Sequence, residues 1–147
     1  MNTFEFSEDW WLPYPRADVA GVLLDLAMYP TWWPQVVAVA SLGPDDARVL
    51  CRSMLPYTLD LVLHAQSRDD HVLETLVSGD LSGVARWRLL DEGPGTRMLF
   101  EQEVRVAGRW QALGAALARP AVRWNHQRMM AGCRAGLSRR LAGSVAD

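Results

Sequence analysis

Lysine is absent from this sequence, and all fifteen of its cationic residues are arginines. Mechanisms that need a lysine amine, including Schiff-base formation and phosphate binding by a P-loop lysine, are therefore excluded. Cysteine is scarce as well, because Cys51 and Cys133 lie far apart in the chain and form no CxxC motif. This usage argues against a disulfide scaffold and predicts a reduced, cytoplasmic protein.

Long hydrophobic runs and signal segments are also lacking. The best apolar run, residues 19–28, is interrupted by Asp25 and is too short to span a bilayer. The opening residues MNTFEFSEDWW carry acids where a secretory signal would carry positive charge. No signal peptide and no membrane-spanning helix are therefore predicted.

Motifs for metal binding and nucleophilic catalysis are missing too. The three histidines, His64, His71 and His126, are far apart and form no HxH or HExxH pattern, so no metal site is predicted. The sequence has no GxSxG motif and no glycine-rich phosphate loop before a helix. We expect no cofactor, and we interpret Cys133 as an inert buried thiol.

The composition that remains is that of an ordinary globular protein. The chain has 147 residues, of which half are hydrophobic and 22% are charged, so we expect a single domain spanning 1–147. Residues 1–104 combine seven arginines with sixteen acids, whereas residues 105–147 combine eight arginines with one acid. The C-terminal segment is therefore basic and the rest is acidic.

The first third of the chain predicts a strand followed by helix. Aromatic residues from Phe4 to Trp11 favour a first strand, which Pro13 and Pro15 end. Apolar residues at helical spacing then predict a helix over residues 15–28, stopped by Pro30. The residues TWWPQV that follow predict a tight aromatic turn or a short second helix.

From residue 35 to residue 106 the pattern changes to short strands separated by turn signals. The breaks fall at 43–46, 56, 68–70, 78–80 and 91–95. Their regular spacing predicts sequential antiparallel strands, that is, a meander. Within residues 81–89 and 97–106, apolar and charged residues alternate, which is typical of a sheet with one wet face and one covered face.

The C-terminal segment is the only part long enough to cover that sheet. Helical spacing resumes near Arg109, meets Pro120 and continues to about Leu141. After Pro120, one apolar stripe at three- and four-residue spacing comprises Val122, His126, Met129, Met130, Cys133, Leu137 and Leu141. Small residues beside the stripe, Gly132 and Gly136, and on the sheet, Gly83 and Ala85, predict close approach of helix and sheet.

The order of these elements resembles the START-like, or SRPBCC, superfamily, the polyketide cyclase/dehydrase and lipid-transport group with a helix-grip fold. The resemblance rests on YPTWWPQV (29–36), LPYTLDLVL (55–63), SGDLSGVARWRL (78–89), GTRMLF (95–100) and the RP…RM…G…GL…L pattern of 119–141. It implies an α+β fold in which a curved antiparallel sheet of six or seven strands wraps a long C-terminal helix. It also implies a deep cavity between sheet and helix that holds an apolar ligand.

Candidate residues of that cavity follow from the predicted inner faces. His126 lies on the helix stripe and could orient a ligand carbonyl or hydroxyl, or act as an acid or base. Gln102 lies between Phe100 and Val104 and needs a hydrogen-bond partner if it is buried. The full predicted set is Trp33, Met54, Trp87, Phe100, Gln102, His126, Met129 and Met130. Plain core packing is the alternative for each of them alone.

Three functions remain open from the sequence. The first is binding or transport of an apolar or amphipathic small molecule, and the second is a cyclase or aromatase that uses His126 as its acid–base residue. The third is an interaction module that uses the basic helix. Its arginines, Arg123, Arg128, Arg134 and Arg139, form a solvated face or contact an anionic membrane. A net charge of −2 argues against nucleic acid, and we expect a monomer or weak dimer.

Overall fold

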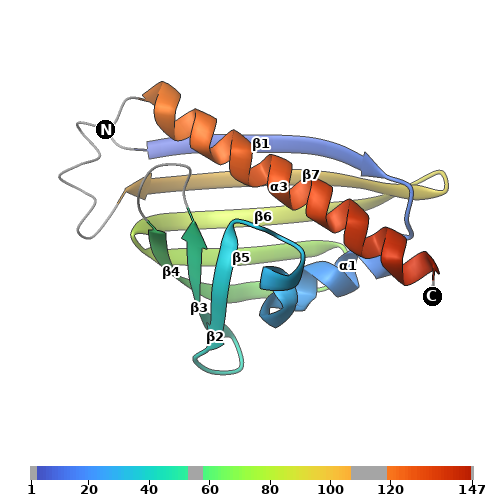
Figure 1. The fold of residues 1–147 in the computed structure, drawn as a ribbon, viewed down its shortest axis with the longest axis horizontal. Coiled ribbons are helices and arrows are strands. Elements are labelled where there is room, and N and C mark those ends of the chain that lie inside the picture. The colour runs from blue at the N-terminus through green and yellow to red at the C-terminus, as the bar shows by residue number, and fades with distance from the viewer. Residues whose placement is uncertain (1–2, 53–57, 107–118, 147) are drawn as a thin grey trace.

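The structure is a computed structural model and describes residues 3–52, 58–106 and 119–146 (Figure 1). The described residues form, in chain order, β1 (Thr3–Leu12), α1 (Arg16–Leu24), the 3₁₀ helix η1 (Leu26–Thr31), β2 (Val36–Ser41), β3 (Asp46–Arg52), β4 (Thr58–Arg68), β5 (Val72–Gly79), β6 (Leu81–Glu92), β7 (Gly95–Val106) and α3 (Arg119–Ala146). No helix among the described residues is long and apolar enough to cross a membrane.

The strands form one antiparallel seven-stranded sheet in the order β1-β7-β6-β5-β4-β3-β2. Strands β2 to β7 pair with their neighbours in sequence, which confirms the predicted meander, and β1 closes the order beside β7. The predicted breaks at 43–46, 68–70, 78–80 and 91–95 all coincide with connections between strands. The break at Pro56 lies outside the described residues. The α+β helix-grip fold expected from the sequence is therefore confirmed.

The two helical segments after β1 differ in detail from the sequence prediction. Helix α1 ends at Leu24, four residues before the expected end, and η1 follows with Pro30 inside it. The sequence placed the second segment at TWWPQV, one turn later. Proline has no backbone N–H to donate. A short 3₁₀ helix tolerates Pro30 because it makes few internal hydrogen bonds. Helical spacing alone did not separate α1 from η1, because the apolar residues of both helices pack on the same core. Val19 and Leu23 of α1 are buried in it, and Tyr29 of η1 packs against it.

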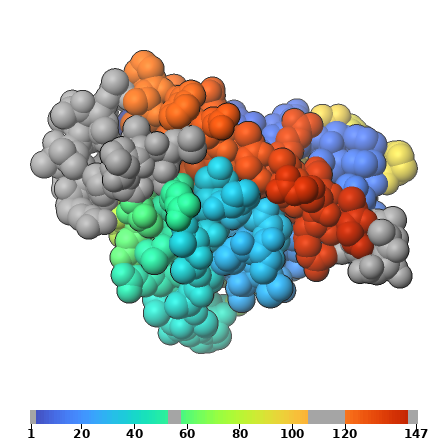
Figure 2. All heavy atoms as spheres, in the orientation of Figure 1, coloured from blue at the N-terminus to red at the C-terminus, as the bar shows by residue number. Residues whose placement is uncertain are grey.

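Helix α3 crosses the concave face of the sheet, above the long strands β1, β7 and β6 (Figure 1). Its 28 residues correspond to a length of about 42 Å. The predicted helical residues 109–118 all lie outside the described residues. The space-filling view shows α3 lying diagonally over the molecule, directly beside η1 and β2 (Figure 2).

Burial changes along the apolar stripe of α3. The C-terminal half of the stripe is sealed, since Cys133 and Leu137 are 0% exposed and Leu141 is 1% exposed. In the N-terminal half, by contrast, Val122, His126 and Met129 are only half-buried. The helix therefore packs tightly on the sheet and α1 at one end, and its other half does not seal the sheet beneath it.

The glycines of α3 permit close approach, although to a different partner than the sequence predicted. A Cβ atom at Gly136 would lie 1.7 Å from the backbone oxygen of Trp32, and one at Gly132 would lie 2.0 Å from Gln35 Oε1. The close approach is therefore to the segment that follows η1, not to the sheet. Gly83 likewise approaches the backbone of β7 at Glu103, not the helix.

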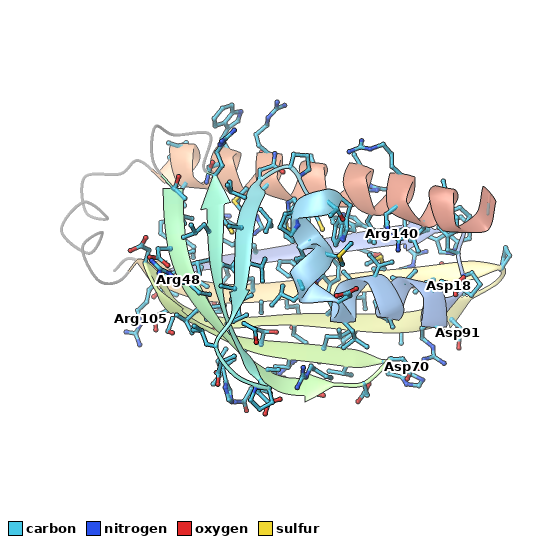
Figure 3. All side chains as sticks on the ribbon, turned by 60° about the horizontal axis from the view of Figure 1, so that its bottom comes forward. Asp18, Arg48, Asp70, Asp91, Arg105 and Arg140 are labelled. Carbon is cyan, nitrogen blue, oxygen red and sulfur yellow. The ribbon has the colours of Figure 1, made fainter. Side chains whose placement is uncertain are left out.

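Ion pairs fasten α1 to the strand turns at one end of the sheet. Arg16 contacts Asp70 Oδ2 at 2.8 Å and Asp91 Oδ1 at 3.3 Å, and both acids lie beside α1 in Figure 3. These contacts raise the pKa of Arg16 against the opposing effect of desolvation. They link α1 to the β4–β5 turn and to the end of β6, and so close the molecule at the sealed end of α3.

Candidate functional site

A row of four small or polar side chains and one phenylalanine crosses the inner face of the sheet. Strand register places Ala65, Thr75, Ala85, Gln102 and Phe6 side by side on β4, β5, β6, β7 and β1. We call these five residues the floor row. Each is half-buried, although four of them lie on interior strands of the sheet, where inward-facing side chains are often fully buried.

Apolar rows border the floor row on both sides. Leu73, Trp87 and Phe100 lie in one adjacent register, and Val77, Gly83 and Val104 lie in the other. The buried side chains divide into three separate clusters, centred on the α1–α3 end, on β2 to β5, and on Phe4 with Val104. A packed domain of this size normally has one contiguous core. The floor row borders these clusters, since Ala85 packs against the first of them and Phe6 against the third.

His126 of α3 contacts the floor row directly. Its Nε2 lies 2.9 Å from Gln102 Oε1, so the imidazole N–H donates to the amide oxygen. Its ring stacks on Phe6, with ring centroids 3.6 Å apart and an interplanar angle of 6°, and a longer stacking contact joins it to Phe100. The sequence singled out His126 and Gln102 separately, and the structure places them in one hydrogen bond.

Burial determines the charge of this histidine. Desolvation lowers the pKa of His126 from 6.5 to about 4, because removing the ring from water disfavours the imidazolium. Desolvation alone accounts for this shift, and the hydrogen-bond partner of His126 is the neutral amide of Gln102. At neutral pH the side chain is therefore an uncharged imidazole with a single N–H.

The other predicted cavity residues occupy different positions. Trp87 and Phe100 meet at a centroid distance of 4.7 Å beside the floor row, and Trp33 donates its indole N–H to the Met129 carbonyl at 3.0 Å. Phe100 and Met130, however, are only 6% and 3% exposed and belong to the same buried core cluster. Met54 lies outside the described residues. Whether any of these side chains contacts a ligand stays a prediction.

Sequence reasoning overlooked three inward-facing residues. Phe6 and Thr75 belong to the floor row, and Glu8 is half-buried on the inner face of β1, where it accepts a hydrogen bond from the Trp10 indole at 3.3 Å. The alternation of Phe4, Phe6, Trp10 and Leu12 was a usable signal for the inner face of β1. That alternation predicts that Glu8 also faces inward, although a carboxylate on an apolar strand face is rare.

Nucleophilic and metal chemistry gain no support from the described residues. Burial and the nearby carboxylate of Glu8 raise the pKa of Cys133, so its thiol stays protonated. One group, Asp69, Asp70 and His71, has ligand atoms close enough for an ion, but all three residues are exposed in a turn. Asp69 already accepts the backbone N–H groups of His71 and Val72, which explains its position.

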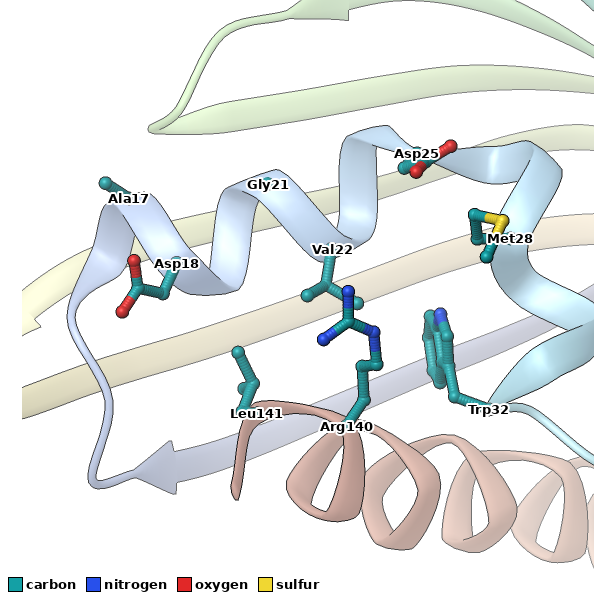
Figure 4. Close-up of a pocket in the computed structure, with 9 residues that line it drawn as sticks. All are labelled: Ala17, Asp18, Gly21, Val22, Asp25, Met28, Trp32, Arg140 and Leu141. Carbon is teal, nitrogen blue, oxygen red and sulfur yellow. The ribbon is translucent and has the colours of Figure 1, made fainter. Parts of the chain in front are cut away.

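A hollow lies between α1 and the C-terminal half of α3 (Figure 4). Its volume is about 450 Å³, and its lining is Ala17, Asp18, Gly21, Val22, Asp25, Met28, Trp32, Arg140 and Leu141. Exposed charged residues on both helices border it, and the buried indole N–H of Trp32 has no hydrogen-bond partner. We call it the outer pocket.

The predicted basic face of α3 is solvent-exposed. Arg123, Arg128, Arg134 and Arg139 are all exposed, and Arg134 also lies 5.8 Å from the Trp10 ring centroid. The exposed Trp124 adds an apolar surface near the start of the helix. Contact of this face with a membrane stays a prediction.

Comparison with known proteins supports this reading of the fold. The family model described as "Polyketide cyclase / dehydrase and lipid transport" matches residues 4–137. No curated protein matches the chain. Among solved structures, a START superfamily protein from Mycobacterium smegmatis has a TM-score of 0.78 at 15% identity and covers 95% of this chain and 97% of its own.

Two further structures share the fold at similarly low identity. A conserved protein from Geobacillus kaustophilus has a TM-score of 0.80 at 12% identity, with 96% of this chain and 97% of that chain covered. The Zhui aromatase/cyclase from a Streptomyces species has a TM-score of 0.77 at 13% identity, with coverage of 97% and 96%. At such identities the likeness shows the fold and not the activity.

Proposed function

Because the chain belongs to the polyketide cyclase/dehydrase and lipid transport family, we propose that it binds an apolar or amphipathic small molecule between the inner face of the sheet and α3. The observation that supports this proposal is the half-buried floor row, four of whose five residues lie on interior strands of the sheet. Side chains in that position are sealed in a filled core. We call the space above the floor row the inner chamber.

The residues around the inner chamber suit an apolar guest. Trp87, Phe100 and Met129 provide aromatic and thioether surfaces, which adapt to irregular apolar shapes. The hydrogen-bonded pair Gln102–His126 supplies a few fixed polar atoms among them. A mainly apolar lining with few placed polar groups is the usual composition of a small-molecule site.

Binding without reaction fits this site better than the cyclase alternative does. A general base near neutral pH needs a pKa close to 7, whereas the pKa of His126 is lowered to about 4. Its partner Gln102 is an amide and cannot stabilise an imidazolium as a carboxylate would. We therefore propose a binding or transport role, with catalysis by His126 as the second candidate.

Native mass spectrometry of the freshly purified protein tests the binding role, followed by denaturing extraction of whatever is released. We expect a stoichiometric apolar compound that is lost on unfolding. Protein that is repeatedly empty, and whose melting temperature is unaffected by a panel of hydrophobic compounds, would contradict the proposal.

A matched pair of variants locates the bound compound. We expect Ala85→Phe to reduce ligand occupancy at least tenfold, because the added ring fills the floor row. Ala17→Phe places the same ring at the outer pocket and should leave occupancy unchanged. Loss of ligand in Ala17→Phe alone would move the site to the outer pocket. Ala65→Phe, in the same floor row, replaces Ala85→Phe if that variant does not fold.

The variant His126→Phe separates binding from catalysis. A binding protein should keep its ligand with an affinity changed by no more than about tenfold, because the aromatic ring and its stacking on Phe6 are retained. An enzyme that uses His126 as acid or base should lose turnover by a factor of about 10² or more while it remains folded.

A further inference from the structure

We propose that the inner chamber selects apolar ligands that carry a carbonyl or a similar hydrogen-bond acceptor, which binds the amide N–H groups of Gln102. This inference rests on the proposed binding function and adds the polarity of the ligand. It depends on how His126 orients the Gln102 side chain.

Gln102 lies near the middle of the inner face. Its register neighbours are Ala85 on β6 and Phe6 on β1, so the residue on one side of it is too small to cover its amide. The side chain is half-buried. A primary amide has two N–H donors and one oxygen acceptor, and in this position each of them needs either protein, water or ligand as partner.

The hydrogen bond to His126 takes up the oxygen. The uncharged imidazole has one N–H, and Nε2 lies 2.9 Å from Gln102 Oε1. Stacking on Phe6 at 3.6 Å holds the imidazole plane parallel to the phenyl ring. Because the amide is planar, its NH₂ group then points away from His126. His126 is thus a positioning residue that leaves two donors available to the inner chamber.

The surroundings of those donors are apolar. Trp87 and Phe100 lie next to Gln102 in the adjacent register row. A ligand binds most favourably when its acceptor oxygen reaches the Gln102 N–H groups while its apolar part contacts these aromatic rings. A guest without an acceptor would bury the NH₂ group unpaired, which is unfavourable. The site is therefore expected to bind a ligand with a hydrogen-bond acceptor more tightly than an equally apolar ligand without one.

Three naphthalenes of one carbon skeleton test the inference by isothermal titration calorimetry: 2-acetylnaphthalene, 1-(2-naphthyl)ethanol and 2-ethylnaphthalene. We expect the ketone to bind about tenfold more tightly than 2-ethylnaphthalene. In Gln102→Leu the two should bind within about twofold of each other. Gln127→Leu makes the same change at an exposed position of α3, outside the floor row, and serves as the matched control, which should retain the preference.

Nuclear magnetic resonance gives a readout that a merely structural role would not move. The side-chain NH₂ resonances of Gln102 should shift with the ketone and not with 2-ethylnaphthalene. In His126→Phe, where the amide loses its orienting partner, the ketone preference should fall while 2-ethylnaphthalene still binds. Gln102→Met, which keeps the length of the side chain, replaces Gln102→Leu if that variant does not fold.

The outcomes that overturn the inference differ from those that overturn the binding function. Equal affinity for ketone and hydrocarbon, with both bound, contradicts acceptor selection and leaves the binding function standing. Preference for the alcohol over the ketone, abolished in Gln102→Leu, shows that the amide is reversed and also contradicts it. If none of the three compounds binds and the purified protein is empty, the binding function itself fails.

Discussion

His126 shows how one residue couples folding to pH. Its imidazole is held by Gln102 and Phe6, and its pKa is lowered from 6.5 to about 4 by desolvation. The unfolded chain therefore binds a proton at this position at a higher pH than the folded chain does. The stability that the neutral ring confers is fully present above pH 6.5 and is lost as the pH falls toward 4.

We expect the free energy of unfolding to decrease by up to about 3 kcal/mol between pH 7 and pH 4 on account of this residue. Urea denaturation at half-unit pH steps measures the effect. The variant His126→Phe should show a much flatter profile between pH 6.5 and 4.5. The carboxyl groups of Asp69 and Asp70, whose pKa values are held below 3.8, titrate mainly at lower pH. Equal slopes in both proteins would contradict the assignment.

At the scale of elements, α3 is attached in two different ways along its length. Toward its C-terminal end it is sealed against α1 and the sheet through Leu137 and Leu141. In the middle, Gly132 and Gly136 permit contact with the segment from Trp32 to Gln35, and Trp33 adds a hydrogen bond to the Met129 carbonyl. The helix is thus fixed in its middle to the segment after η1, beside the proposed inner chamber, while Val122, His126 and Met129 in its N-terminal half are only half-buried.

A matched pair of glycine substitutions tests this attachment. Gly136→Ala places a methyl group 1.7 Å from the Trp32 backbone oxygen, and we expect a loss of stability of about 2 kcal/mol or more. Gly143→Ala, on the same helix with no atom within 4 Å, should stabilise the protein by about 0.5–1 kcal/mol, because alanine is the better helix former. Chemical denaturation measures both. Equal effects would show that α3 is not fixed at Gly136.

At the scale of the whole molecule, one end of the space between sheet and α3 is sealed, and the proposed inner chamber lies toward the other end. Leu89 and Met98 are 0% exposed at the sealed end. Ala85, on the same face of β6 four residues before Leu89, is half-buried. Space that is kept unfilled forgoes the stability that packed side chains would supply. Binding proteins commonly show such a trade between stability and function.

The same substitution at two inward-facing alanines measures this trade. Ala85→Val adds two methyl groups to the floor row, and we expect it to stabilise the protein by about 0.5–1 kcal/mol through burial and strand propensity while it weakens ligand binding. Ala47→Val adds them to a buried position on β3 and should destabilise by about 1–3 kcal/mol through overpacking. Destabilisation in both proteins would indicate that the chamber is already filled.

The sequence by itself determined the type and order of the elements. Alternation in 81–89 and 97–106, the turn signals between strands and the stripe of α3 are local patterns, and each reflects contacts that a residue makes with its own face of a helix or strand. The same patterns identified the inward direction of Trp87, Phe100, Gln102 and His126. Among the described elements they misplaced boundaries, as at the end of α1, where apolar spacing continues into η1.

Only the tertiary structure decided which of those inward positions are sealed. The pairing of His126 with Gln102, and of both with Phe6, depends on the register of β1 against β7 and on where α3 crosses them. Met130 and Met129 are adjacent on one stripe, yet one is buried and the other half-buried. Periodicity specifies the face on which a side chain lies. The distance to the opposite element follows from long-range packing, which no local pattern encodes.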